Sequence, residues 1–522
     1  MGSLKSNKLN NLTAKEWTQY STSVILFSSK NQLIKRISRI YSKEKATIGY
    51  FNPFIKPKWK KRRQFSREFY SEHSNENKYS LIIVDLQDVK STSQYKKAEK
   101  WFENQIKVYI GSLEDSKYLL VIANDFNDPY YKIKYFPTHY FLIQTLEKYR
   151  FLHTDLWALS NPKMIGSFSP TFLLCFKQSD NMLGPPLKYS SQDFINNVTK
   201  YHLRTKYIYE KVIQGFSSTR EPEYLKHGAT FPQPLIEYFI KIFTEERDSV
   251  LDIFSGVGLS LFAAINLQRN AIGIELNPKY IRWTNNLKKR KFGQLMNYVY
   301  NETPNRASFK VINDDNRNLL VHIEKNSVDL MITSPPYFNI LHKVEDEAEK
   351  RGTESVYRRR KSNTIKNLPS LYKYFGTNSI EKKSSIDTDN TAEQILSSSL
   401  IPHPYSGDDK DLGNITSYHE FLKEIEQTHI RVFKVLKPGS FALWIIKDFR
   451  DMTNNIPYVN FHSDLATLAI KNGFIYFDLL VWNQNRERRL IHLGGGNTYY
   501  NSMTMSFIVI LQKPTKAKEK DY

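Results

Sequence analysis

The sequence predicts an α/β fold with a mostly parallel sheet and helices on both faces, and two observations lead to this prediction. First, short apolar runs such as Leu81–Asp85, Ser249–Phe254 and Val328–Ile332 alternate with longer stretches of helical periodicity. Apolar runs without strict alternation are typical of strands that are buried on both faces of a parallel sheet. Second, a strand, a glycine-rich turn, a helix, a strand and an acid follow one another between Ser249 and Glu275. That order is typical of a nucleotide-binding βαβ unit.

The length and composition place the chain among globular proteins of more than one domain. It has 522 residues, of which 40% are hydrophobic and 25% charged, so it exceeds one ordinary core and is too apolar to be disordered. No apolar run reaches the roughly 18–20 residues of a membrane span, and the first residues lack the apolar segment of a signal peptide. The single cysteine, Cys175, excludes an intramolecular disulfide. We therefore expect a cytoplasmic protein without a membrane partner.

The net charge of +22 is the most informative bulk property of the chain. It favours a polyanionic partner, and nucleic acid is the default polyanion. The alternative is a chain from a generally basic proteome, in which the charge has no specific partner.

The N-terminal region has its own α/β pattern. Up to about Asn75 its main feature is the basic cluster Lys58–Arg63, which could contact phosphates or could be a solvated loop. From Tyr79 onward the periodicity predicts strands and helices in alternation. The expected strands lie at 81–85, at 118–122, near 152 and at 172–176, and the expected helices end near 109 and span 139–149.

This region shares residue spacings with the end of the chain. Asp125–Asp128 reads Asp-Phe-Asn-Asp, and Asp448–Asp451 reads Asp-Phe-Arg-Asp. In both regions a histidine precedes a phenylalanine by 12 residues and an aspartate by 16, namely His139, Phe151 and Asp155 in the first region and His462, Phe474 and Asp478 in the second. The spacings predict an internal duplication, although any two strand–helix–strand units look partly alike.

The turn Phe254–Gly258, with the sequence Phe-Ser-Gly-Val-Gly, is the first part of a predicted cofactor site. Its glycines let the backbone approach a ligand closely, although a purely structural turn is an alternative. Glu275 follows Gly256 by 19 residues, close to the roughly 20 at which an acid reaches ribose hydroxyls. No lysine of a phosphate-binding loop follows the glycines, so an adenosine ligand without a pyrophosphate, such as S-adenosylmethionine, fits better. Asp315 could accept from an adenine amino group or could cap the helix that begins at Arg317.

The second part of the predicted site is the turn Thr333–Tyr337, with the sequence Thr-Ser-Pro-Pro-Tyr, at the end of an apolar strand. Two prolines end a strand stiffly because they lack N–H donors and fix φ. The turn therefore presents the Ser334 hydroxyl, the carbonyls of Pro335 and Pro336 and the Tyr337 ring at the carboxyl edge of the sheet, where open α/β sheets bind ligands. The alternative is a proline-terminated strand beside a loop.

Together these motifs resemble the N4-cytosine and N6-adenine DNA amino-methyltransferases. The chain departs from the family at Gly228, where the family usually has proline, and in a basic, tyrosine-rich insertion after Tyr337. The resemblance spans about Tyr224 to Lys513 and is carried by His227–Pro232, Asp252–Gly258, Glu275, Asp315–Arg317, Thr333–Tyr337, Asp411–Gly413 and Val435–Gly439. It implies a Rossmann-like S-adenosylmethionine-dependent methyltransferase sheet with the gamma order of motifs.

The resemblance also implies roles for individual residues. The methionine half of S-adenosylmethionine would lie against Thr230, Phe231 and Pro232. The adenosine half would lie among Asp252, Phe254, Ser255, Gly256, Gly258, Glu275 and Asp315. The catalytic residues would be Ser334, Pro335, Pro336 and Tyr337, and no metal is implied.

These assignments divide the chain into five expected parts. They are an N-terminal α/β region, 1–190, that resembles a degenerate methyltransferase half; a helical connector, 191–223; a catalytic domain, 224–337 with 411–513; a basic insertion, 338–410; and a charged tail, 514–522. The N-terminal half has Asp85–Asp88 where the catalytic domain has its proline turn. We therefore expect that half to be a scaffold without chemistry.

The basic insertion is the first choice for target recognition, because basic and aromatic residues beside a catalytic turn suit phosphate contacts and base reading. The alternatives are a mobile surface insertion and recognition elements in the N-terminal half. The residues expected to contact DNA are Arg358, Arg359, Arg360 and Lys361 in the insertion and Arg486, Arg488 and Arg489 in a second basic loop.

The expected activity is transfer of a methyl group from S-adenosylmethionine to the N4 amine of cytosine in double-stranded DNA. Serine at the first turn position is usual among N4-cytosine members of the family, and N6-adenine is the alternative. Methylation at C5 is excluded because it needs a nucleophilic cysteine, and Cys175 lies in an apolar strand. An RNA amino-methyltransferase and a catalytically dead nucleic-acid binder are less favoured. We expect a functional pairing with a restriction endonuclease.

Overall fold

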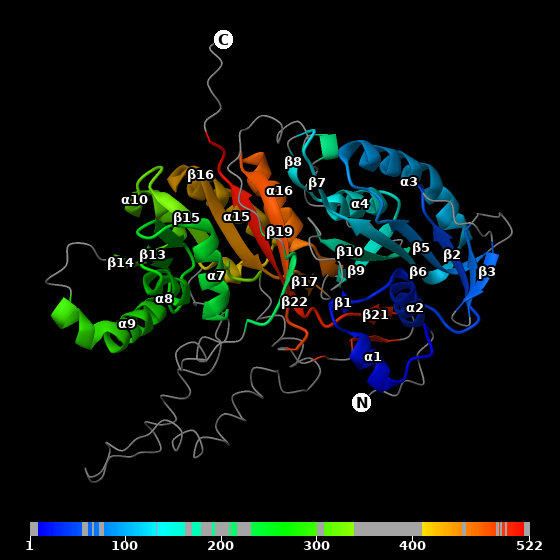
Figure 1. Ribbon diagram of the computed structural model, residues 1–522, viewed down its shortest axis with the longest axis horizontal. Helices are drawn as coiled ribbons and strands as arrows, with labels where there is room; N and C mark the ends of the chain where they lie inside the picture. The colour runs from blue at the N-terminus through cyan, green and yellow to red at the C-terminus, as the bar shows by residue number, and fades with distance from the viewer. Residues whose placement is uncertain are drawn as a thin grey trace, which may run out of the picture. The chain divides into compact units, whose positions relative to one another are not determined.

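The computed structural model forms two compact units. It describes residues 9–54, 61–64, 67–71, 78–131, 133–161, 170–178, 190–192, 194, 208, 210–216, 231–299, 307–338, 410–451, 456–486, 490, 493–495 and 498–515. Unit 1 comprises Met1–Gly215 and Pro438–Tyr522, and unit 2 comprises Phe216–Lys437 (Figure 1). Each unit is described by itself below.

The N-terminal part of unit 1 contains an eight-stranded sheet in the order β1-β9-β10-β6-β5-β2-β4-β3. Its strands are β1 (Val24–Leu26), β2 (Thr47–Phe51), β3 (Lys61–Gln64), β4 (Arg67–Tyr70), β5 (Tyr79–Leu86), β6 (Leu113–Asn124), β9 (Phe151–Ser160) and β10 (Thr171–Gln178). The helices are α1 (Ala14–Tyr20), α2 (Lys30–Tyr41), α3 (Thr92–Ser112) and α4 (Thr138–Glu147), and β7 (Phe126–Asp128) and β8 (Ile133–Phe136) form a hairpin. Successive residues of β5 are buried, so helices cover both faces of the sheet.

The C-terminal part of unit 1 repeats half of this arrangement. Strands β11 (Val212–Ile213), β19 (Ile475–Asn483), β22 (Met505–Gln512) and β16 (Leu436–Ile446) lie in that order, with β22 antiparallel to both neighbours. The order matches β1-β9-β10-β6, in which β10 is the antiparallel strand. The hairpin of β17 (Phe449–Asp451) and β18 (Ile456–Val459) precedes α16 (Phe461–Lys471), as β7 and β8 precede α4.

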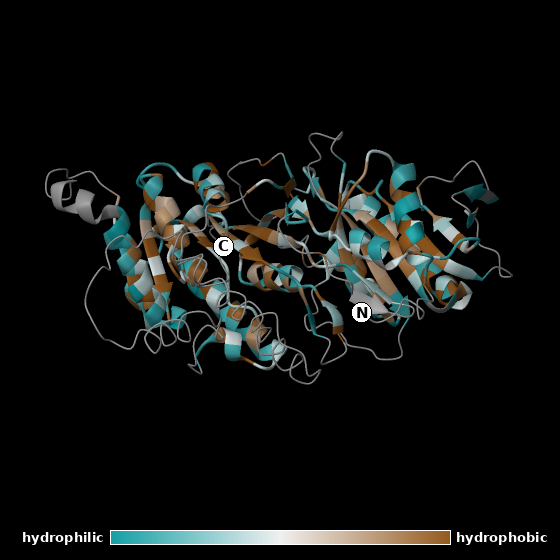
Figure 2. Ribbon diagram, turned by 90° about the horizontal axis from the view of Figure 1, so that it is seen from below, coloured by the Kyte–Doolittle hydropathy of each residue, from teal (hydrophilic) through white to brown (hydrophobic). Residues whose placement is uncertain are grey.

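Unit 2 contains four parallel strands in the order β15-β12-β13-β14. They are β12 (Ser249–Asp252), β13 (Asn270–Glu275), β14 (Phe309–Asn313) and β15 (Val328–Thr333). The helices are α7 (Gln233–Phe243), α8 (Leu259–Asn266), α9 (Pro278–Val299), α10 (Leu319–His322) and α15 (Tyr418–Val435), with short 3-10 turns η2 (Asn316–Asn318) and η3 (Leu412–Asn414). This is the doubly wound α/β topology that the sequence predicts, with a Rossmann-like strand–turn–helix–strand unit from β12 to β13. In Figure 2 the strands are mostly brown, and teal gathers on the helices around them.

The predicted strands and helices of both halves are confirmed, but two stretches differ from expectation. In the expected helical connector, 191–223, Val212 and Ile213 form strand β11, which pairs with β19. A two-residue edge strand has too few residues for periodicity to identify it. Part of the basic cluster near residue 60 is β3, an edge strand that pairs only with β4, so its side chains need no apolar pattern.

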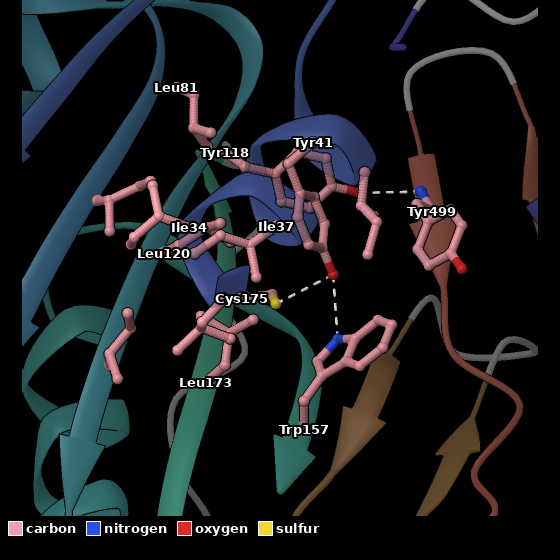
Figure 3. Packing of buried hydrophobic residues seen from close by; sticks show 14 of the residues in the cluster. Ile34, Ile37, Tyr41, Leu81, Tyr118, Leu120, Trp157, Leu173, Cys175 and Tyr499 are labelled. Carbon is pink, nitrogen blue, oxygen red and sulfur yellow. Dashed lines mark hydrogen bonds between the residues drawn. The ribbon is translucent and has the colours of Figure 1, made fainter. Parts of the chain in front are cut away.

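Aromatic rings dominate the core of the N-terminal part of unit 1 (Figure 3). Tyr41 accepts a hydrogen bond from Trp157 Nε1 at 3.0 Å and one from Cys175 Sγ at 3.2 Å. Cys175 is fully buried, and burial raises the pKa of its thiol well above the usual range. The expectation that Cys175 is a core residue is therefore confirmed. Tyr499, in the hairpin of β20 (Leu493–Gly495) and β21 (Thr498–Tyr500), joins the same core.

Candidate functional site

The carboxyl ends of the four parallel strands of unit 2 carry predicted cofactor residues and the start of the predicted catalytic turn. β12 ends at Asp252, β13 at Glu275 and β15 at Thr333, and Asp315 follows the end of β14 by two residues. All four strands run in the same direction, so these residues lie along one edge of the sheet. Open α/β sheets bind their ligands at that edge.

Asp252, at the end of β12, is hydrogen-bonded to the end of β15, the strand that precedes the catalytic turn. Its Oδ1 accepts from Thr333 Oγ1 at 2.6 Å and from the Phe254 backbone N–H at 3.1 Å, and its Oδ2 accepts from Ser260 Oγ. The side chain is buried, and burial raises its pKa while these three hydrogen bonds oppose the shift. Both oxygens are thus engaged by the protein, so Asp252 holds the end of β15 in place beside the glycine-rich turn.

The turn after β12 has the conformation that its glycines permit. Gly256 has φ +51° and Gly258 has φ +76°, in the left-handed region that other residues rarely adopt. A Cβ at Gly258 would lie 2.7 Å from Thr284 Cγ2 in α9, so packing also requires glycine there. The Ser255 hydroxyl is buried and has no hydrogen-bond partner among the described residues. A buried hydroxyl of this kind is a group that a ligand can satisfy.

Glu275 closes the turn from the neighbouring strand. Its Oε2 accepts from the Gly256 N–H at 2.8 Å, and its Oε1 accepts from the Asn277 N–H at 2.7 Å. Burial raises the pKa of Glu275 to about 7, the two backbone hydrogen bonds oppose the shift, and the charges of Asp411 and Asp252 add to it. Three carboxyl groups near one another suit a cationic ligand. The residues present therefore fit S-adenosylmethionine, which carries a sulfonium group and an ammonium group.

Asp411 belongs to this site although the sequence reasoning gave it no role there. It is buried, its Oδ1 accepts from the Gly413 N–H at 2.9 Å, and it caps the 3-10 turn η3. Its charge is close enough to raise the pKa of Glu275. The signal was available, since Asp411–Gly413 matches a family motif, but the insertion of about 70 residues hid its closeness to the cofactor turn.

Asp315 has the capping role that was one of its two alternatives. Its Oδ1 accepts from the Arg317 N–H at 2.9 Å, and its Oδ2 accepts from Arg317 Nη1 at 2.9 Å. Arg317 Nε donates to Glu424 Oε2 of α15, also at 2.9 Å. Carboxylate oxygens have more than one lone pair, so the cap does not prevent Asp315 from also accepting from an adenine amino group.

The catalytic turn is held by its prolines and by α15. Pro335 and Pro336 are buried, whereas Ser334 and Tyr337 are half-buried. The next residue, Phe338, is buried, with its ring centroid 5.5 Å from that of Tyr418 and 5.7 Å from that of Phe421. The turn is therefore fixed on both sides, by the Thr333–Asp252 hydrogen bond and by this aromatic cluster.

The remaining predicted site residues fall in three groups. Phe231 and Pro232 are half-buried at the start of α7, where Pro232 is the N-cap. Arg486 is exposed and follows β19 closely in unit 1. Thr230, Arg358, Arg359, Arg360, Lys361, Arg488 and Arg489 lie outside the described residues.

The corresponding edge of the N-terminal sheet is filled by its own side chains. β2 and β5 have there the places that β12 and β15 have in unit 2. Asp85 of β5 is fully buried, forms an ion pair with Lys30 Nζ and accepts from Tyr50 OH. A lysine thus neutralises this carboxylate, and no glycine turn follows β2.

Two further observations concern the described residues of the whole chain. No group of three or more histidine, cysteine, aspartate or glutamate side chains is placed to hold a metal ion in the described part. None of the described helices is both long and apolar enough to cross a membrane.

Comparison with known proteins identifies the family. The N6_N4_Mtase model of DNA methylases matches residues 15–286, which is more than half of the chain. The match includes the N-terminal region and the cofactor turn, and it ends before Asp315 and the Thr333–Tyr337 turn.

Individual relatives match shorter segments. The Type II methyltransferase M.BglI of Bacillus subtilis is 34% identical over 104 residues, 18% of this chain and 30% of the relative. The Type II methyltransferase M.MjaI of Methanocaldococcus jannaschii is 30% identical over 162 residues, 27% of this chain and 51% of the relative. The chain thus spans about half or less of these relatives' lengths.

A solved structure of SAM-dependent methyltransferases from Methanosarcina mazei is 14% identical, covers 53% of this chain and 98% of the other, and has a TM-score of 0.25. The fold assignment therefore rests on the strand order and on the cofactor turn described above. With the family model matching over half its length, the chain belongs to the N6/N4 DNA methylase family, and its cofactor is S-adenosylmethionine.

Proposed function

We propose that the protein transfers a methyl group from S-adenosylmethionine to the exocyclic N4 amine of cytosine in duplex DNA at a specific sequence. The observation that carries the proposal is the hydrogen bond from Thr333 Oγ1 to Asp252 Oδ1 at 2.6 Å. It fixes the start of the catalytic turn against the end of the cofactor strand, within one unit. Holding two reactants in a fixed geometry accounts for much of the rate of a transfer reaction.

The catalytic turn provides acceptors for the amine rather than a strong base. An exocyclic amine is a poor nucleophile because its lone pair is delocalised into the ring. If the Ser334 hydroxyl oxygen and the Pro335 carbonyl oxygen accept its two N–H groups, the nitrogen becomes more tetrahedral and its lone pair points out of the ring. The half-buried ring of Tyr337 supplies a face on which a flipped base can stack. When bound, S-adenosylmethionine would supply the electrophilic methyl group, whose bond to sulfur breaks as the N–C bond forms. S-adenosylhomocysteine is left, and the surplus proton of the methylated nitrogen leaves to water.

Different side chains of the predicted cofactor site would bind different parts of S-adenosylmethionine. Glu275 in its ionised form accepts from the ribose hydroxyls, and Asp315 accepts from the adenine amino group. The Ser255 hydroxyl, which lacks a partner among the described residues, donates to the ligand. Phe231 and Pro232, at the start of α7, cover the methionine end together with Thr230.

We also propose that the N-terminal half is a degenerate methyltransferase copy. The matching strand orders, the match of the family model from residue 15 and the Lys30–Asp85 ion pair in the place of the catalytic turn all support this assignment. The catalytic domain would then be 224–337 with 411–513, and 338–410 the target-recognition insertion with Arg358, Arg359, Arg360 and Lys361. Arg486, Arg488 and Arg489 would add phosphate contacts, for which the net charge of +22 is favourable.

The biological setting we propose is modification of cytoplasmic DNA in partnership with a restriction endonuclease of the same sequence specificity. The support is that two relatives are named Type II methyltransferases. An endonuclease that cuts DNA from cells without this protein, and spares DNA methylated by it, would be the direct support for the pairing.

The test of the base is nucleoside analysis after methylation with isotopically labelled S-adenosylmethionine. Duplex DNA should yield labelled N4-methylcytosine. Labelled N6-methyladenine would replace the proposed base by the alternative one. Label in tRNA but not in duplex DNA would overturn the DNA assignment.

The affinity for S-adenosylmethionine should fall as the pH is lowered from 8 to 6. The pKa of Glu275 is raised to about 7, so its carboxyl is mostly protonated at pH 6 and cannot accept two ribose hydroxyls. Because the competent ionised form decreases below that pKa, we expect roughly tenfold weaker binding at pH 6, measured by calorimetry. The Glu275→Gln protein should bind weakly at both pH values, and equal wild-type affinities at pH 6 and pH 8 would contradict the role of Glu275.

Each chain should bind one molecule of S-adenosylmethionine. In the N-terminal sheet the strand equivalent to β13 is β4, which ends in Tyr70 rather than an acid, and Asp85 at the end of β5 is paired with Lys30. Neither strand end therefore offers the carboxylate that Glu275 provides in unit 2. Calorimetry should give a stoichiometry of one, and Lys30→Ala should leave both stoichiometry and affinity unchanged. A second site, lost in the Lys30→Ala or Asp85→Ala protein, would show that the N-terminal half is a working cofactor domain.

A further inference from the structure

Two histidines meet at the centre of unit 1, one from each repeat of the duplicated pattern. His139 Nε2 lies 3.0 Å from His462 Nε2, and both side chains are fully buried. Each histidine stands at the start of a helix, α4 or α16, and each is held by an aspartate. Asp125 Oδ2 is 2.6 Å from His139 Nδ1, and Asp448 Oδ2 is 2.7 Å from His462 Nδ1.

The surrounding contacts are reciprocal. The Tyr135 ring of β8 lies 4.6 Å from the Tyr476 ring of β19, and the Tyr458 ring of β18 lies 5.1 Å from the His153 ring of β9. β8 of the N-terminal repeat thus contacts β19 of the C-terminal one, and β18 of the C-terminal repeat contacts β9 of the N-terminal one. The equivalent residues are all 323 positions apart: Asp125 and Asp448, Tyr135 and Tyr458, His139 and His462, His153 and Tyr476, and Asp155 and Asp478.

Reciprocal contact of equivalent residues is the mark of an isologous, twofold interface between two subunits. Residue i of one subunit meets residue j of the other, and j meets i. An ordinary interface within one chain has no reason to obey this rule. We infer that the chain is a covalent dimer of two methylase folds, in which the N-terminal repeat is the permanent partner of a dimerisation face on the C-terminal repeat. This face comprises the ten residues paired above and is called the shared face. The inference goes beyond the proposed methylation and does not depend on it.

The two histidines on the pseudo-twofold axis lie at hydrogen-bond distance, which is too short for a metal ion between their Nε2 atoms. Their rings are within 18° of coplanar and their centroids are 5.2 Å apart, which places the two Nε2 atoms nearly on the line between the rings. A zinc ion between them on that line would need an N–N distance of roughly 4 Å, since Zn–N bonds are about 2.0 Å. Each Nδ1 is hydrogen-bonded to an aspartate, so the two Nε2 atoms are left to face each other across the axis. Ser463 Oγ, within 3.2 Å of both Nε2 atoms, adds a further contact.

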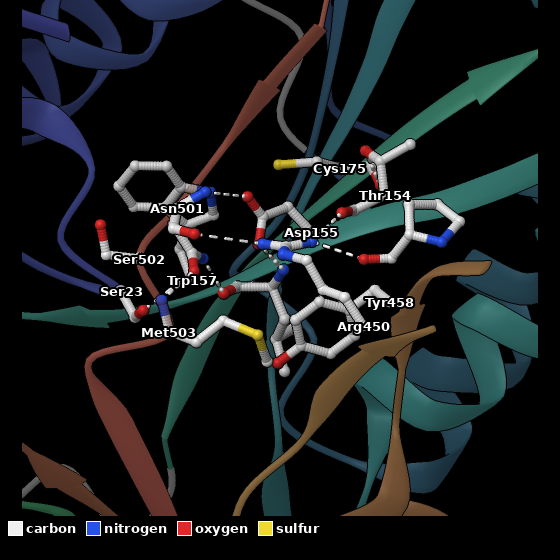
Figure 4. Close-up of polar contacts among 12 residues, drawn as sticks. Ser23, Thr154, Asp155, Trp157, Cys175, Arg450, Tyr458, Asn501, Ser502 and Met503 are labelled. Carbon is white, nitrogen blue, oxygen red and sulfur yellow. Dashed lines mark hydrogen bonds and ion pairs between the residues drawn. The ribbon is translucent and has the colours of Figure 1, made fainter. Parts of the chain in front are cut away.

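The ion pairs of the two equivalent aspartates, Asp155 and Asp478, do not follow the twofold symmetry. Arg450 Nη2 donates to Asp155 Oδ1 across the face at 3.0 Å (Figure 4). The residue equivalent to Arg450 in the N-terminal repeat is Asn127, which is uncharged and too short to form the equivalent ion pair. The residue equivalent to Asp155 is Asp478, and its ion pair is with Lys211, just before β11. Each of the two buried aspartates thus has one cationic partner. The N-terminal repeat, however, has Asn127 in place of the arginine that would pair with Asp478.

The test restores the lost symmetry. Lys211→Met removes the partner of Asp478, which is buried, and should lower the urea midpoint of unfolding. Adding Asn127→Arg places an arginine at the position equivalent to Arg450. If the face is twofold, that arginine reaches Asp478, and the double variant recovers most of the lost midpoint. Asn127→Met with Lys211→Met is the matched control and should recover nothing.

Failure of Asn127→Arg to exceed Asn127→Met in recovery would overturn the twofold assignment. A second measurement is independent of the stability of these variants. Because the N-terminal repeat already covers the dimerisation face, the full chain should have the mass of a monomer, 61.4 kDa, in light scattering at micromolar concentration. A dimer whose mass does not change with concentration would show that the dimerisation face remains free to bind a second chain, and would overturn the inference.

Discussion

Replacing Ser334 by alanine should lower the rate of methyl transfer to duplex DNA by about 10²–10³-fold, the loss typical of one preorganised polar contact in an active site. Ser334 follows β15 directly, and the strand is held beside the cofactor turn by the Thr333–Asp252 hydrogen bond. Without the hydroxyl oxygen, one N–H of the target amine has no acceptor and the nitrogen lone pair stays delocalised. The effect should therefore appear in kcat more than in the affinity for S-adenosylmethionine.

The measurement is transfer of a tritiated methyl group to duplex DNA under single-turnover conditions. Cofactor affinity, measured by calorimetry, should be unchanged, because Ser334 is not one of the cofactor groups. Ser327→Ala is the matched control: Ser327 stands just before the same strand, and its hydroxyl donates to the Glu324 carbonyl at 2.7 Å. The control should keep wild-type activity. Normal transfer by the Ser334→Ala protein would remove the serine from the mechanism.

The parts of the site that sequence reasoning located are those that follow strand ends. Asp252, Glu275 and Ser334 each lie at or just after the end of a buried apolar run, and parallel strands bring such residues to one edge. The pattern of single strands is therefore enough to group these residues. The order of the strands, by contrast, follows from long-range pairing that periodicity does not report.

Asp411 and Asp315 show where this reasoning ends. Asp411 approaches Glu275 closely enough to raise its pKa, yet about 70 residues of insertion separate it from the catalytic turn in sequence. Asp315 caps η2 and binds Arg317, whose other contact is with Glu424. Which of two local roles a carboxylate takes depends on partners that lie far away along the chain.

The first 75 residues were poorly anticipated for a different reason. The four residues of β3, Lys61–Gln64, are all polar, because an edge strand pairs on one side only and can be solvated. β1, in the same stretch, has three residues, and β11, which lies at Val212–Ile213, has two; both are too short for any period to register. The sequence pattern thus predicts long buried strands, but it does not predict short strands at the edge of a sheet.

The internal duplication could be predicted from residue spacings in the sequence, whereas the contact between the two repeats could not. Equal intervals after His139 and His462 indicated that two regions share a pattern. That the two side chains would face each other at 3.0 Å could not be inferred from intervals, since repeats can stack, separate or pair in many ways. The reciprocal contacts require the three-dimensional arrangement of β8, β9, β18 and β19 within unit 1.

Replacing Arg450 by methionine should cost about 3–5 kcal/mol of unfolding free energy at pH 7, the usual loss when one partner of a buried ion pair is removed. Arg450 is 9% exposed and Asp155 is fully buried. The arginine also donates to the Thr154 carbonyl at 3.0 Å and lies over the Tyr500 ring at 4.6 Å. Methionine keeps some of the packing but leaves the carboxylate without its cation (Figure 4).

The loss should depend on pH in a definite direction. Burial already raises the pKa of Asp155 in the folded protein, and the Arg450 charge is the largest opposing cause. Without that charge the folded-state pKa rises further above the unfolded value. A carboxyl whose pKa is raised by folding binds its proton more tightly in the folded state, so stability increases as the pH falls through the interval between the two values. The deficit of the variant relative to wild type should therefore be largest near pH 8 and shrink toward pH 5.

Urea unfolding of four proteins separates the ion pair from the packing. Arg450→Met should be the least stable at pH 8, and Asp155→Asn combined with Arg450→Met should regain part of the loss because no buried charge remains. Asp155→Asn alone removes the carboxylate from Arg450 and also alters the hydrogen bonds that Asp155 accepts from the backbone N–H groups of Asn501 and Leu156, so it completes the double-mutant cycle. A deficit that is the same at pH 5 and pH 8, together with additive losses in the double variant, would mean that Arg450 stabilises the shared face by packing alone. A coupled, pH-dependent deficit instead means that the two repeats are joined by a charge pair whose arginine is present in the C-terminal repeat alone, because Asn127 has the equivalent position.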